Sequence, residues 1–127
     1  MKFVSFLQNN QAKFGISDGK NITDLTGKIG GANTLKELIA NKLIQEAKEF
    51  SRKNPGNINL DEIEYLPVIP NPGKIVCVGL NYSEHVKETG RTVEQNPVIF
   101  LRVPESQTAH KQPVSYTHLR AHETLTD

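Results

Sequence analysis

The stretch that most constrains the fold of this 127-residue chain spans residues 70–90 and reads PNPGKIVCVGLNYSEHVKETG. Residues 74–78 form a β-branched run without polar alternation, which predicts a strand buried on both faces. Gly79 ends this run where a side chain would crowd a sharp bend. Ser83 is then a suitable N-cap for a short helical turn over residues 84–89.

Four polar or aromatic residues after this strand are candidates for a functional site. His85 and Glu88 are three positions apart, so a helical turn places them on one face, where they can touch. Such a pair suits acid–base chemistry, although an exposed surface pair has the same pattern. Asn81 and Tyr82 precede the pair, and they either shape the floor of a pocket or only turn the chain.

The motif resembles the start of the catalytic domain in the fumarylacetoacetate hydrolase superfamily. In that family a strand, a glycine, Asn-Tyr and then a histidine with a glutamate three residues later recur in this order. Residues 96–102, NPVIFLR, are similar to the P-x-x-F-x-K/R strand that follows in the family. The resemblance covers residues 1–114 and is weaker in the first half. Two positions depart from the common pattern: Glu84, which is more often Asp, and Arg102, which is commonly Lys.

The resemblance implies a metal-dependent hydrolase or lyase that cleaves a C–C bond in an acylpyruvate or related 2-oxo or 1,3-dicarbonyl acid. A carboxylate-bound Mg²⁺ or Mn²⁺ would stabilise the enolate that leaves. His85 would take a proton from water, and Glu88 would orient the imidazole. Arg102 would bind a carboxylate of this small-molecule substrate, though an arginine on a surface strand is the plainer reading. The resemblance also implies a homodimer.

Two other functions stay open from the sequence. The same scaffold could isomerise or decarboxylate a hydroxymuconate-type dicarboxylate, or cleave ureidoglycolate. Alternatively the chain is an inactive fragment, because nothing after Val114 matches the family's Glu-x-Glu pair and later Asp. We therefore expect the metal ligands to be absent from this chain and assign no metal residue. An open sheet edge with an apolar face would then favour aggregation or a molten state.

The first half of the chain predicts a small lobe of its own. Residues 2–7 and 11–16 read as a hairpin around Asn9-Asn10, and residues 21–25 read as a third strand. Gly27, Gly30 and Gly31 read as a loose connection.

Two helical segments follow in this lobe. Thr34 and Glu37 form a capping box that begins a helix with Leu35, Leu38 and Ile39 on one stripe. Asn41-Lys42 breaks this helix before a second segment that carries Leu43, Ala47 and Phe50, and residues 58–68 return to an extended pattern.

The predicted fold class is α+β and mostly β. A hairpin-plus-helix lobe covers residues 1–69, and the truncated start of the family's mixed β-roll catalytic domain covers residues 70–114. Residues 115–127, SYTHLRAHETLTD, look like translated sequencing adapter and are expected to be a non-native tail. His118 and His122 in this tail imitate a helical metal pair but lack a third ligand.

The composition and charge of the chain indicate which partners and which cellular compartment to expect. The net charge of +1 favours neither nucleic acid nor an anionic membrane. Cys77, the single cysteine, is expected to be a small buried side chain in a reducing cytosol. No signal peptide or bilayer-spanning stretch is evident, so we expect a soluble, cytoplasmic protein. His110 lies in a loop sequence and reads as an ordinary loop residue.

Overall fold

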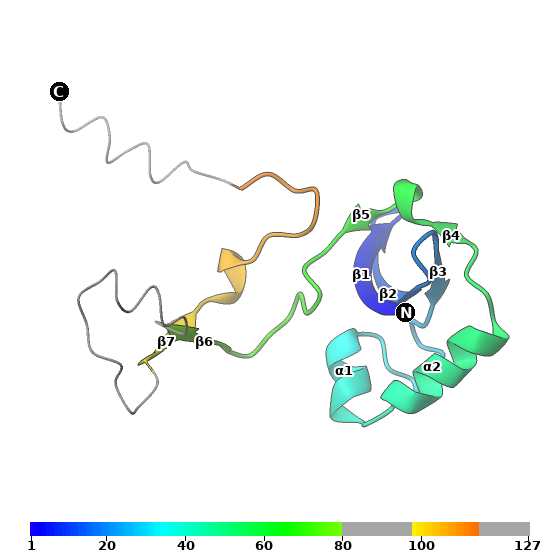
Figure 1. Ribbon diagram of the computed structural model, residues 1–127, viewed down its shortest axis with the longest axis horizontal. Helices are drawn as coiled ribbons and strands as arrows, with labels where there is room; N and C mark the ends of the chain where they lie inside the picture. Colours follow the sequence, from blue (N-terminus) through cyan, green and yellow to red (C-terminus); the bar gives the residue numbers. More distant parts are fainter. Residues whose placement is uncertain (80–97, 115–127) are drawn as a thin grey trace. The chain divides into compact units, whose positions relative to one another are not determined.

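The computed structural model describes residues 1–79 and 98–114, and these fall into two compact units (Figure 1). The first unit contains Met1–Ile69 together with residues 108–114, and the second lies within Pro70–Gln107. Each unit is described by itself below.

The first unit is built on a curled, antiparallel five-stranded sheet (Figure 1). Its strands follow the order β4-β3-β2-β1-β5. They are β1 (Lys2–Gln8), β2 (Gln11–Ser17), β3 (Asn21–Asp24), β4 (Ile58–Asn59) and β5 (Glu64–Tyr65).

The hairpin predicted between the first two strands is confirmed. Gln8 pairs with Gln11, so only Asn9 and Asn10 form the turn. Both have positive φ, 49° and 62°, as a type I′ turn requires. Asparagine tolerates this left-handed conformation better than most residues, so the local sequence itself fixes the register of the hairpin.

The two predicted helices are also present, as α1 (Leu35–Ala40) and α2 (Ile44–Lys53). The Thr34 hydroxyl accepts a hydrogen bond from the Glu37 backbone N–H at 3.2 Å, which is the N-cap predicted from the capping box. The Glu37 carboxylate reaches back to the backbone N–H of Asn33, at 2.7 Å. Lys42, with φ of 59°, separates the two helices.

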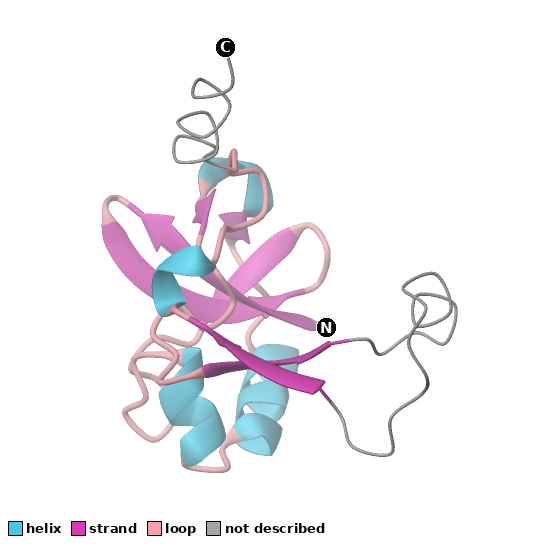
Figure 2. Cartoon of the chain, turned by 90° about the vertical axis from the view of Figure 1, so that its left-hand side faces the viewer, coloured by secondary structure: helices cyan, strands magenta, loops and turns pink. Residues whose placement is uncertain are grey.

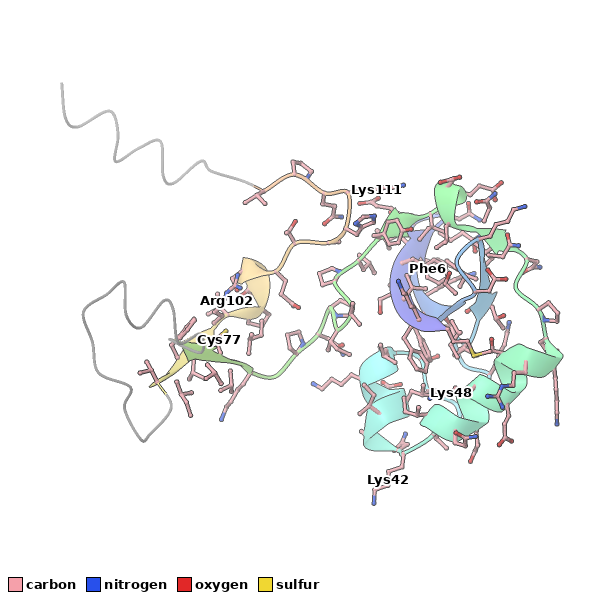
Figure 3. All side chains as sticks on the ribbon, viewed as in Figure 1. Phe6, Lys42, Lys48, Cys77, Arg102 and Lys111 are labelled. Atoms are coloured by element: carbon pink, nitrogen blue, oxygen red, sulfur yellow. The ribbon has the colours of Figure 1, made fainter. Side chains whose placement is uncertain are left out.

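The sheet has one hydrophobic cluster on each face, because successive side chains of a strand point to opposite sides. The two helices lie on one side of the sheet (Figure 2). On this helical face Phe14 and Ile16 of β2 pack with Leu38 and Ala47 of the helices. The other face carries Phe6, fully buried within the curl of the sheet (Figure 3). Hydrophobic contacts on both faces of the sheet therefore hold this unit together.

Three details of the first unit differ from the sequence prediction. Ile39 is 51% exposed rather than part of the buried stripe, because α1 turns it away from the sheet. The glycine-rich connection is not loose, since Ile29 and Ala32 within it are buried in the core. The extended pattern of residues 58–68 is interrupted by a 3-10 turn, η1 (Leu60–Glu62).

The second unit contains a two-stranded antiparallel sheet of β6 (Ile75–Gly79) and β7 (Val98–Arg102), followed by the 3-10 turn η2 (Pro104–Ser106). Both strands were expected. The prediction that the first is buried on both faces is wrong for the described residues, since alternate side chains of β6 are exposed. A ribbon of two strands has too few neighbours to cover both of its faces.

One face of this ribbon is wholly aliphatic. Val76 lies opposite Leu101, and Val78 lies opposite Ile99, so all four side chains share a face. Each is between 53% and 67% exposed. We call these four residues the aliphatic face.

The described residues are α+β and mostly β, as predicted. Whether the second unit begins a β-roll, and whether residues 1–69 and 70–114 are separate domains, stay predictions. Residues 108–114 pack on the first unit, where the Gln112 side-chain amide donates to the Tyr65 carbonyl at 3.1 Å. No helix within residues 1–79 and 98–114 has the length and hydrophobicity to cross a bilayer.

Candidate functional site

Four of the five predicted site residues, Asn81, Tyr82, His85 and Glu88, lie outside the described residues. The predicted tail, residues 115–127, lies outside them too. The structure does show the two strands between which the four site residues fall in sequence. The chain leaves β6 at Gly79 and enters β7 at Val98, and these two residues are register partners.

Arg102, the fifth predicted site residue, ends β7 and is exposed (Figure 3). Its guanidinium donates to the carbonyl oxygen of Ser106 at 2.6 Å. The Ser106 hydroxyl in turn donates to the Val103 carbonyl, also at 2.6 Å. The η2 turn therefore holds one edge of the guanidinium. A guanidinium has five N–H donors, so others remain for a carboxylate ligand.

Cys77 lies on the same face of the ribbon as Arg102, because strand residues two apart share a face and Ile75 is the register partner of Arg102. Its thiol is free and half-buried, less enclosed than the sequence predicted. Phe100 is the register partner of Cys77 and lies beside it on the same face of the ribbon.

The described residues offer no ready metal site. Among residues 1–79 and 98–114 there is no group of three or more His, Cys, Asp or Glu side chains that could hold an ion. Glu64, which has the Glu-x-Glu spacing with Glu62, instead accepts from the Gln112 side chain at 3.3 Å.

His110 has a definite neighbour that sequence reasoning missed. Its ring meets the Tyr65 ring edge to face, with centroids 4.9 Å apart. Lys111 lies on the same tyrosine, its Nζ 5.9 Å from the ring centroid. No local sequence signal could have shown this, because the two aromatic side chains are 45 positions apart.

Comparison with known proteins finds several oxaloacetate tautomerases among the relatives, although no family model matches the chain. Oxaloacetate tautomerase fahd2, mitochondrial, of Xenopus laevis is 29% identical over 102 residues, which cover 78% of this chain and 32% of the relative. Oxaloacetate tautomerase YcgM of Escherichia coli (strain K12) is 40% identical over 42 residues, 33% of this chain and 19% of the relative. Oxaloacetate tautomerase FAHD1, mitochondrial, of Arabidopsis thaliana is 44% identical over 45 residues, 35% of this chain and 20% of the relative.

The chain is similar to members of the fumarylacetoacetate hydrolase superfamily, the family that the motif order in residues 70–102 resembles. It spans about a third of the Xenopus relative and a fifth of the other two. The activity of a whole protein is therefore a matter for proposal.

Proposed function

We propose that the protein carrying this chain is an enzyme that interconverts the keto and enol forms of a 2-oxo dicarboxylic acid of the oxaloacetate type. The observation that carries the proposal is the shared name of relatives from an amphibian, a bacterium and a plant, each an oxaloacetate tautomerase. The proposal keeps the enolate that the family resemblance implied. It replaces bond cleavage by proton transfer as the first hypothesis.

The proposed chemistry needs a base that works near neutral pH. Removal of a proton from carbon 3 of the keto acid gives the enolate, and a proton added to the enolate oxygen then gives the enol. The imidazole of His85 suits both transfers, because its ordinary pKa lies near the operating pH. Glu88, three residues on, would accept from the other ring nitrogen and stabilise the imidazolium.

The proposed substrate carries carboxylates, so the site also needs a positively charged side chain that can bind one of them. Arg102 supports this role, since its exposed guanidinium is held at one edge by the Ser106 carbonyl. A planar fork fixed in this way can still present two parallel N–H groups to a carboxylate.

The Mg²⁺ or Mn²⁺ that the resemblance implies finds no set of ligands among the described residues. We therefore assign no step of the reaction to a metal here. The roles above concern only side chains of this chain.

The hydrolase reading remains the second candidate, because a His–Glu pair can equally activate water for attack on a carbonyl carbon. It would apply to an acylpyruvate, with C–C cleavage. The hydroxymuconate-type isomerase or decarboxylase and the ureidoglycolate lyase are further variants of the same enolate chemistry. The inactive fragment stays a prediction for the 127-residue chain itself.

A substrate panel on the full-length protein separates these functions. We expect enol-oxaloacetate to disappear faster with the full-length protein than in buffer alone. We expect the protein to release no pyruvate from acetylpyruvate. Cleavage of acetylpyruvate without oxaloacetate tautomerisation would favour the hydrolase instead.

A matched pair of arginine variants tests the carboxylate role. Arg102→Gln should raise KM for oxaloacetate about tenfold or more, the effect of losing a charge-assisted hydrogen bond of about 1.5–3 kcal/mol. Arg52→Gln, which removes an exposed arginine from the end of α2, should leave KM unchanged. Equal KM values in both variants would remove Arg102 from the site.

The proposed compartment remains the cytoplasm, and the resemblance still implies a homodimer. Two relatives are named as mitochondrial. Cell fractionation of a tagged full-length copy tests the location, because co-purification with mitochondria would contradict it. Analytical ultracentrifugation tests the dimer.

A further inference from the structure

The first unit contains a half-open pocket of about 470 Å³ beside the N-terminal half of β1. The sheet order creates it. β5 pairs with β1 only at Phe6 and Leu7, so the first residues of β1 have no strand beyond them within the described sheet. The volume lies within the roughly 300–1,000 Å³ typical of small-molecule pockets.

The walls of this pocket are largely apolar. Phe3 and Val4 of β1 form one side, and Leu66 and Val68 after β5 form another. His110 lines it as well, braced against the ring of Tyr65 at 4.9 Å. A ligand with a short hydrocarbon body would be enclosed on several sides.

The described residues that line the pocket include basic side chains and no carboxylate. Lys2 and His110 are the basic side chains, and no Asp or Glu is among the described residues that line it. A bound anion would therefore meet no like charge from the lining residues.

Two nearly buried hydroxyls add polar groups to the lining. Ser5 is 3% exposed and donates to the Val68 carbonyl at 2.7 Å, which ties two walls together. Ser17 is 7% exposed and accepts from the Gly19 backbone N–H at 3.0 Å. Its O–H group can still donate a hydrogen bond to a ligand oxygen.

We propose that this pocket binds a small amphipathic carboxylate, a monoanion with a short aliphatic or aromatic body. The carboxylate would lie toward Lys2 and His110, and the body would pack on Phe3 and Leu66. Arg102, the described residue of the proposed tautomerase site, is not among the described residues that line this pocket.

The test uses the full 127-residue chain and saturation-transfer difference NMR, which detects weak binding of small ligands to a protein. Three probes share one hydrocarbon body: hexanoate, hexanol and hexylamine. We expect hexanoate to bind about 1.4- to fivefold more tightly than hexanol, as an exposed ion pair of about 0.2–1 kcal/mol gives. Hexylamine should bind more weakly still. Equal affinity of all three probes would overturn the proposal.

Variants locate the binding and keep the test independent of folding. Val68→Glu adds a negative charge at a pocket position that is already 57% exposed, and it should abolish hexanoate binding. Ile39→Glu, the matched control at an exposed position of α1 away from the pocket, should bind hexanoate like the original chain. If Val68→Glu still binds hexanoate while Leu101→Glu on the aliphatic face does not, the ligand binds there and the proposal is wrong.

Discussion

Truncation of adjacent residues on α1 tests how this short helix is oriented against the sheet. Leu38 is fully buried in the cluster that contains Phe14 and Leu25. Leu38→Ala removes its side chain from a packed site, so we expect unfolding to become easier by about 3–4 kcal/mol, from lost transfer free energy plus the cavity. Ile39→Ala removes a similar volume from a side chain that is 51% exposed. Because Ile39→Ala leaves no cavity, it should lower the free energy of unfolding by less than about 1 kcal/mol.

The assay is urea unfolding followed by far-UV circular dichroism, which reports the loss of α1 and α2. Both variants should keep the m-value of the original chain, so that the difference lies in the midpoint alone. Costs for Leu38→Ala and Ile39→Ala that agree within about 0.5 kcal/mol would refute the orientation of the helix.

Two further predictions concern charge and association. Hydrogen bonds from the backbone N–H groups of Asn21 and Lys20 hold the pKa of Asp18 below its usual value. Its contribution to stability is thus present above the ordinary pKa of an unfolded Asp and is lost as the pH falls through the lowered folded value. Asp18→Asn should make Tm less dependent on pH between neutral and strongly acidic buffer; an unchanged dependence would contradict this. Val78→Lys should reduce self-association through the aliphatic face in sedimentation velocity, whereas Ile39→Lys should not; equal association would exclude that face.

The parts of the fold that could be predicted have local physical causes. Asn9-Asn10 fits a turn with two positive φ angles, and Thr34 with Glu37 fits a helix start. These signals involve neighbouring residues, so the sequence alone is enough to identify them. The position of Ile39 was not accessible in the same way, because a helix of six residues has too few turns to define its buried side.

The rest depends on contacts between distant segments. A β-branched run such as that of β6 is compatible with burial on one face or two, and only neighbouring layers decide between them. The pocket is lined by Lys2, Tyr65 and His110, which come from segments far apart in the sequence. The candidate pair, His85 and Glu88, came from motif order and family resemblance, and it lies outside the described residues.

The central claim is that His85 transfers the proton in an oxaloacetate-type tautomerase. The most direct measurement is kcat for enol-oxaloacetate in the full-length protein and in its His85→Ala variant, with circular dichroism to show that both are folded. We predict a loss of about 10²–10⁴-fold, the usual contribution of a general base. Full turnover by a folded His85→Ala variant would contradict the claim.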